Sequence, residues 1–196
     1  MTKLNTINNH DKLIPIIQIG NPLLRIISSE VSQTELGTHE LQILINSLFK
    51  IMENNRGIGI AAPQIGINKR IIVFGMKSHP VYTETPSIPY TVLINPIVTT
   101  MTAETEERYE GCLSVGNLRG KVSRFQKIYY KGLDLTGKLI EREVEGLHAR
   151  VVQHESDHLD GILFTDKLSD TKSLGFHQEL VSSGELKMQP SQKTND

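Results

Sequence analysis

The pattern His154-Glu155-Ser156-Asp157-His158 is the feature that most constrains this chain. Residues 146–159 have apolar side chains at helical spacing, and Gly161 follows as a stop signal, so we predict a helix over this range. Two histidines four residues apart project from one face of a helix and can share one metal ion. Glu155 would then reach a water molecule in the open position of that ion. The pattern predicts a metal site but leaves its reaction open.

A third protein ligand would discriminate between enzyme classes, because catalytic sites of this type usually have three protein ligands and one open position. One class of protease places another histidine after the glycine, but here Gly161 is followed by the apolar run Ile162 to Phe164. Another class uses a downstream glutamate, for which Glu179 and Glu185 are candidates. The remaining candidate is Cys112, the only cysteine. A thiolate with two imidazoles suits Zn²⁺ or Fe²⁺ and is a poor match for Mg²⁺ or Ca²⁺.

Strand patterns follow one another along the chain without helices between them. Apolar or alternating residues predict strands at 13–19, 70–74, 92–97, 121–134 and 138–145, the last two joined by a hairpin turn. The apolar residues from Leu41 to Met52 recur every three or four positions, which predicts a helix from about Thr38 to Asn54. Adjacent strands argue against a parallel sheet with crossover helices and favour an α+β domain.

Length and composition suit one ordinary domain. We assign the 196 residues to a single catalytic domain with a core at about 13–168 and a polar C-terminal extension at 169–196. The net charge of -1 gives no bulk attraction for nucleic acid or anionic membranes. No apolar run approaches the roughly 18 residues of a membrane span, and the start lacks a signal-peptide core. We therefore expect a cytoplasmic protein that contacts neither nucleic acid nor membrane directly, with a mobile end at Ser191 to Asp196.

Three segments resemble the signature motifs of the peptide deformylase family. They are Gly57-Ile58-Gly59-Ile60-Ala61-Ala62-Pro63-Gln64, Glu110-Gly111-Cys112-Leu113-Ser114 and Gln153-His154-Glu155-Ser156-Asp157-His158-Leu159-Asp160-Gly161, in the chain order of the family. The likeness covers residues 13–168. It implies an α+β fold in which antiparallel strands pack around a central helix that carries the H-E-x-x-H pattern. It also implies a metal-dependent hydrolase that removes the formyl group from the N-terminal formyl-methionine of newly made polypeptides and releases formate.

The resemblance also implies roles for ten residues. Three would hold the metal, one would be the general base, two would donate hydrogen bonds to the oxyanion of the tetrahedral intermediate, and four would bind the substrate. In that order they are Cys112, His154 and His158; Glu155; the side-chain amide of Gln64 and the backbone N–H of Leu113; and Gly59, Ile58, Leu147 and the apolar stem of Arg119. Leu147 could equally be plain core.

The implied cofactor is one divalent metal ion. The family preference makes Fe²⁺ the expected ion, while the ligand types also permit Zn²⁺, Ni²⁺ or Co²⁺. A thiolate beside Fe²⁺ offers an oxidation route, so we expect an oxygen-sensitive enzyme. A metal-ligating histidine usually donates its other N–H to an acceptor. Asp157 or a backbone carbonyl could accept it here, or Asp157 could pair with Arg150 instead.

The chain departs from the family pattern at two positions. Gly116-Asn117 stands where a proline is common, which predicts a more flexible substrate rim, and Asn21 stands where an aspartate is common. The tail from Ser169 is not noticeably basic, so a transient ribosome contact, which some members make through a basic C-terminal helix, stays open. Besides a deformylase, two hypotheses remain: a protease that uses Glu179 or Glu185, and a metal-binding module without catalysis.

Overall fold

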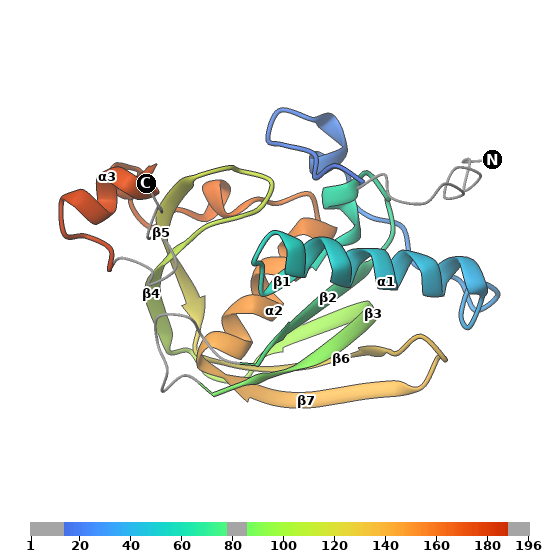
Figure 1. Ribbon diagram of the computed structural model, residues 1–196. Coiled ribbons are helices and arrows are strands. Elements are labelled where there is room, and N and C mark those ends of the chain that lie inside the picture. The colour runs from blue at the N-terminus through green and yellow to red at the C-terminus, as the bar shows by residue number, and fades with distance from the viewer. Residues whose placement is uncertain (1–13, 78–85, 188–196) are drawn as a thin grey trace.

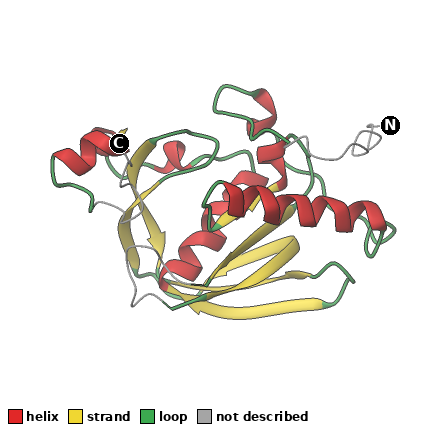
Figure 2. Ribbon diagram, in the orientation of Figure 1, coloured by secondary structure: helices red, strands yellow, loops and turns green. Residues whose placement is uncertain are grey.

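Two antiparallel β-sheets lie on either side of one buried helix, α2 (Gly146–Leu159), in the computed structural model (Figure 1). The structure describes residues 14–77 and 86–187. Strands predominate and the helices are few (Figure 2). The expected α+β class, with antiparallel strands around a central helix, is confirmed.

The larger sheet has five strands in the spatial order β1-β2-β3-β6-β7. Alternate residues of its second strand point to opposite faces. Ile71 and Val73 pack in a core cluster with residues of α1 (His39–Asn54), whereas Ile72 and Phe74 pack in a second cluster with residues of α2. All six residues of this strand are therefore buried. The bounds are β1 Gly59–Ala61, β2 Ile71–Met76, β3 Ile88–Thr100, β6 Lys127–Leu133 and β7 Leu139–Glu145.

The smaller sheet has the order β4-β5-β8. Its strands are β4 (Thr105–Glu110), β5 (Leu118–Phe125) and β8 (Gly175–Phe176). The chain passes from this sheet into the larger one at Gln126, so the single strand predicted at 121–134 is in fact the end of β5 followed by β6. The segment between β4 and β5 carries Cys112, which contacts His158 of α2.

The helix α1 confirms the prediction from its apolar spacing. The side chain of Thr38 caps its first turn by accepting a hydrogen bond from the backbone N–H of Leu41. One face is buried against the larger sheet and consists of Leu41, Leu44, Ile45, Leu48, Ile51 and Met52.

The helix α2 also has the predicted bounds, 146–159. It is buried on more than one face, because the two sheets cover it from both sides. Its buried residues include Arg150, His154, Glu155 and His158 as well as apolar ones. Polar groups in such a place need partners inside the protein.

The strand predicted at 13–19 is wrong in the part that the structure describes. Residues 14–18 form no regular element. The N–H of Ile17 donates to the carbonyl of Gln64 and the N–H of Ile19 to that of Ser114, so the run crosses from one segment to another instead of pairing along either. Ile14, Ile16 and Ile17 are partly buried along that path, whereas Ile19 is exposed. The end at Ser191 to Asp196, expected to be mobile, lies outside the described residues.

Candidate metal centre

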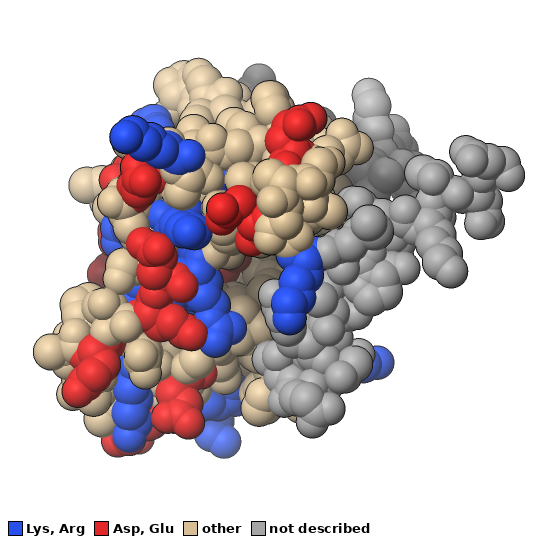
Figure 3. All heavy atoms as spheres, turned by 90° about the vertical axis from the view of Figure 1, so that its left-hand side faces the viewer, with Lys and Arg blue, Asp and Glu red and all other residues tan. Residues whose placement is uncertain are grey.

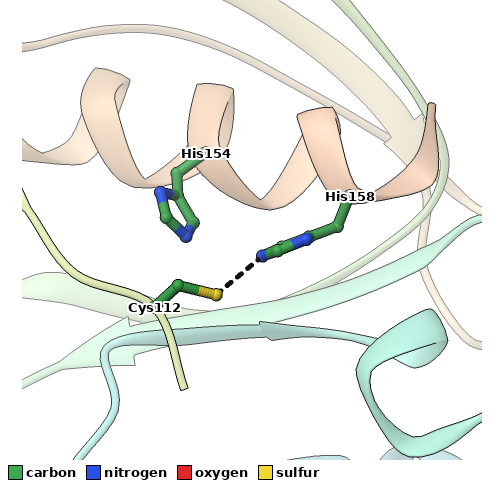
Figure 4. Close-up of side chains that lie close together, drawn as sticks. All are labelled: Cys112, His154 and His158. Atoms are coloured by element: carbon green, nitrogen blue, oxygen red, sulfur yellow. Dashed lines mark hydrogen bonds between the residues drawn. The ribbon is translucent and has the colours of Figure 1, made fainter. Parts of the chain in front are cut away.

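Three side chains from two distant parts of the chain meet beside α2. Cys112 follows β4, while His154 and His158 come from one face of the helix and point toward it (Figure 4). One donor atom from each lies within 4.8 Å of the others, and all three residues are buried. The Cys112 Sγ atom is 3.3 Å from Nε2 of His158. A thiolate and two imidazoles on a rigid helix form a donor set that fits Zn²⁺ or Fe²⁺.

The carboxylate of Glu110 is hydrogen-bonded to one residue of this cluster, His154. Its Oε2 atom accepts hydrogen bonds from Nδ1 of His154 at 2.9 Å and from Arg124 at 3.0 Å. Its Oε1 atom accepts from Arg124 at 3.0 Å and from Arg150 at 2.7 Å. Although burial opposes ionisation, the hydrogen bonds and charges of His154 and Arg124 hold the pKa of Glu110 well below its usual range. A permanently ionised carboxylate therefore fixes the His154 ring with Nε2 turned toward Cys112.

Glu155 follows His154 on α2, and its carboxyl group lies against β1. A Cβ atom at Gly59 would lie 2.4 Å from Oε1 of Glu155, so only glycine leaves room for this carboxyl group. The Oε2 atom is buried and has no hydrogen-bond partner among the described residues. Burial raises the pKa of Glu155 to about 7. A carboxyl group in this state can take up and release a proton near neutral pH.

Gln64 and Leu113 complete the surroundings of Cys112. Gln64 is buried; its Oε1 atom accepts from the N–H of Ala61 at 2.8 Å, which turns Nε2 toward Cys112 Sγ at 3.4 Å and Ser114 Oγ at 3.2 Å. The backbone N–H of Leu113, next to the thiol, donates to no acceptor in the described part of the chain. The backbone N–H of Ser114 donates to Cys112 Sγ at 3.4 Å, so two N–H donors, from Gln64 and Ser114, contact the sulfur.

The sequence and the fold match known proteins. The sequence model described as polypeptide deformylase matches residues 13–174. The chain belongs to the polypeptide deformylase family. "Peptide deformylase 1" of Prochlorococcus marinus is 47% identical over 171 residues, which cover 86% of this chain and 88% of that relative. "Peptide deformylase 1" of Nitrosomonas europaea is 42% identical over 166 residues, which cover 85% and 93% of the two chains.

A solved relative gives the same result for the fold. The class I type b peptide deformylase from Acinetobacter baumannii, 37% identical, superposes with a TM-score of 0.77 over 80% of this chain and 99% of its own. Deformylases are metal-dependent enzymes that remove the formyl group from N-terminal methionine, so the expected family, fold and activity are confirmed. Membership of this family sets aside the protease and the non-catalytic module. Neither Glu179 nor Glu185 belongs to the metal-binding cluster, and Glu185 instead accepts a hydrogen bond from Tyr109.

The contacts of three residues that the resemblance assigns to substrate are as follows. Ile58 and Leu147 pack on the same apolar cluster between the larger sheet and α2. The guanidinium of Arg119 covers Gly111, where a Cβ atom would lie 2.4 Å from Cζ. The structure brings Cys112, His154 and His158 together, with Gln64 hydrogen-bonded to Cys112 and the carboxyl group of Glu155 against Gly59.

The prediction for the second nitrogen of the histidines is wrong for His154, whose partner is Glu110 rather than Asp157. Asp157 instead accepts hydrogen bonds from Arg124 at 2.5 Å and Lys167 at 2.8 Å. For His158, Nδ1 is buried without a hydrogen-bond partner among residues 14–77 and 86–187. The anticipated Asp157–Arg150 pair does not form, because Arg150 contacts Glu110 and the carbonyls of Val122 and Glu106.

Sequence reasoning missed the supporting roles of Glu110, Arg124 and Arg150. One signal was present: Glu110 lies two residues before Cys112 and therefore points to the same side of an extended chain. Nothing in the sequence tells a buried arginine from an exposed one. In the described part of the chain, no helix has the length and apolar character that a membrane crossing needs.

Proposed function

We propose that Cys112, His154 and His158 hold one divalent metal ion, with Fe²⁺ as the native ion, and that Glu155 is the general base for hydrolysis of the formyl group. The observation that carries this proposal is the buried cluster of one thiol and two imidazoles with a carboxyl group of raised pKa beside it. When bound, such a metal activates water and polarises a carbonyl group as a Lewis acid.

Glu155 would take a proton as water attacks the formyl carbon and return it to the leaving amine. A pKa of about 7 allows both steps near neutral pH. The packing of its carboxyl group against Gly59 restricts the positions that the proton acceptor can adopt. This geometry also explains why a glycine follows Ile58 in the strand.

Gln64 and Leu113 would stabilise the oxyanion of the tetrahedral intermediate. The Nε2 group of Gln64 is aimed by the hydrogen bond that its Oε1 atom accepts from Ala61. Donors that are already in position cost no reorganisation when charge develops on the substrate. The side-chain amide of Gln64 contacts Cys112, and Leu113 is the residue that follows this cysteine, which supports the assignment of both donors.

The substrate would lie along β1 with its methionine side chain against Ile58, Leu147 and the stem of Arg119. The Acinetobacter baumannii relative was solved with Met-Ala-Ser bound, a peptide of the type that deformylation leaves. Gly59 has no side chain to keep a peptide backbone away from this strand. Formylated nascent peptides are the substrates of the family, and we place the enzyme in the cytoplasm.

A ribosome contact would have to use a surface of mixed charge. On the face that carries β4, β5 and α3 (His177–Ser182), Lys and Arg side chains are interspersed with Asp and Glu (Figure 3). A patch of one sign, which attracts RNA at long range, is not seen in that view of the described residues.

The test is formate release from formyl-Met-Ala-Ser by protein prepared anaerobically with Fe²⁺. Glu155→Gln should retain its metal and lose at least about 100-fold in kcat/KM, as removal of a general base does. Cys112→Ala should lose metal and activity together. Glu143→Gln, an exposed residue of β7 paired with Lys127, is the matched control. Full activity of Glu155→Gln would contradict the assigned base, and equal activity after aerobic and anaerobic storage would contradict an oxygen-sensitive Fe²⁺ form.

A further inference from the structure

A short C-terminal segment adds a strand beside the site. The family sequence model ends at residue 174, and the Acinetobacter baumannii structure is 99% covered by only 80% of this chain. Residues 175–186, which contain β8 and α3 and which we call the C-terminal latch, lie beyond the family match. In Figure 1 they lie next to β5 at the edge of the smaller sheet.

The latch is hydrogen-bonded to residues 117–119, which follow Cys112 and which we call the rim. β8 pairs with the first two residues of β5, with Phe176 opposite Leu118 and Gly175 opposite Arg119. One residue earlier, the carbonyl of Asn117 accepts a hydrogen bond of 2.8 Å from the N–H of His177. Three consecutive rim residues, 117–119, are therefore held by residues 175–177.

The far end of the latch is tied to the same sheet. The carboxylate of Glu185 accepts a hydrogen bond from Tyr109 of β4 at 3.3 Å and lies 3.8 Å from Nζ of Lys121 of β5. The N–H of Leu186 donates to the carbonyl of Leu180, which closes the latch on itself. The latch thus contacts both strands that flank Cys112.

Arg119 depends on the rim for its position. Its Nη1 group donates to the carbonyls of Leu118 at 2.8 Å and Gly116 at 3.3 Å. The guanidinium lies against Gly111, next to the metal ligand Cys112. Gly116 has a φ of +64°, a conformation that glycine adopts freely, and no proline stiffens this turn. The rim has little stiffness of its own, so its order depends on outside contacts.

We propose that the C-terminal latch is a positioning element for Arg119 and hence for the substrate residues that follow methionine. This rests on the proposed function, in which Arg119 borders the substrate. Loss of the latch should weaken binding of peptides that reach Arg119 and leave the chemistry at the formyl group unchanged. The expected signature is a raised KM with an unchanged kcat.

A pair of variants at His177 isolates the hydrogen bond to Asn117. His177 is the first residue of α3, where proline is well tolerated, and Phe176 before it has φ -68° and ψ 138°, the conformation that proline favours in its predecessor. His177→Pro removes the side chain and the N–H donor, whereas His177→Ala removes the side chain and keeps the donor. The difference between the two therefore reports on the backbone bond.

The measurements are KM and kcat for formyl-Met-Ala-Ser and for formyl-methionine methylamide, together with metal content and calorimetric binding of Met-Ala-Ser. Relative to His177→Ala, His177→Pro should raise KM for the longer substrate and Kd for Met-Ala-Ser by about tenfold, with less than about twofold change for the methylamide. A chain ending at Leu174 should show the same pattern more strongly, with metal content equal to that of the full chain.

Two results would overturn the latch: equal KM values for both His177 variants, or a KM that rises equally for both substrates. The proposed function fails separately, because it requires formate release by the wild-type chain. Met-Ala-Ser binding still measures the latch in a protein that releases none.

Discussion

Two histidines of the helix α2 have different surroundings: His148 near its start is partly buried, and His154 further along is buried. Near the start, the His148 ring packs on Phe74 and Tyr130, with ring centroids 5.6 and 5.8 Å away. Two turns later, His154 faces the carboxylate of Glu110 and the thiol of Cys112. Burial disfavours the charged form of both rings. The neighbours decide the outcome at each end.

At the His148 end, burial and the charge of Arg142 together lower the histidine pKa to about 4. At the other end, burial is outweighed by the hydrogen bonds to Cys112 and Glu110, so the pKa of His154 is raised well above its usual value. The contacts with Glu110 and Cys112, which His148 lacks, account for the opposite directions of the two pKa shifts. Removing the partner of either histidine tests whether these contacts cause the difference between the two ends of the helix.

The largest effect is expected from Glu110→Gln, which removes the anion that distinguishes the metal end. Arg150 would lose its buried ion pair and Arg124 one of its two, so the free energy of unfolding should fall by about 3 kcal/mol or more. His154 would also lose its strong acceptor, and metal content should fall. Urea unfolding and metal analysis measure both changes. Glu106→Gln on the same strand, in an exposed pair with Arg108, is the control and should change stability by less than about 0.5 kcal/mol.

Both long helices and most strands could be predicted from the sequence, because apolar spacing depends on which face of an element is buried. The spacing of His154 and His158 likewise fixed one side of the metal cluster. The break between β5 and β6 could not be predicted. Alternation continues through Gln126, and the change of sheet there depends on contacts with distant strands.

The supporting charges of the site were also beyond local reasoning. Arg124 comes from β5 and Arg150 from α2, and they meet at Glu110 across 14 and 40 residues of sequence. Asp157, which is next to the ligands along the helix, was the natural candidate by spacing. It is instead paired with Arg124 and Lys167. Long-range pairing of buried charges thus outweighed proximity along the chain.

A second, smaller effect tests how closely the metal end is packed. Gly59→Ala would place a methyl group 2.4 Å from Oε1 of Glu155, so the carboxyl group must move. We expect a loss of about 100-fold in kcat/KM, since small displacements of a catalytic group have effects of this size, and a loss of about 2 kcal/mol in stability.

A double-mutant cycle with Glu155→Ala checks the cause. Removing the carboxyl group removes the clash, so Gly59→Ala should cost at least about 1 kcal/mol less in that background. Additive stability losses would show that the methyl group acts through the strand and not through Glu155.

The smallest effect lies at the opposite end of the helix, in the titration of His148. Arg142 donates to the hydroxyl of Tyr130 at 3.1 Å, and that hydroxyl lies 3.3 Å from Nε2 of His148, which can accept its proton only while the ring is neutral. Since the folded pKa of about 4 lies below the unfolded value of about 6.5, the unfolded chain binds the proton first as the pH falls. This residue therefore lowers stability progressively from about pH 6.5 to about pH 4. Because solvent reaches part of the ring, the loss should be about 1 kcal/mol, below the full value of the shift.

In His148→Gln the difference in stability between pH 7 and pH 4.5 should shrink by that amount, while metal content at pH 7 stays at the wild-type level. An unchanged acid limb would mean that His148 has the same pKa in the folded and the unfolded chain, and the two ends of α2 would then differ less than their partners imply.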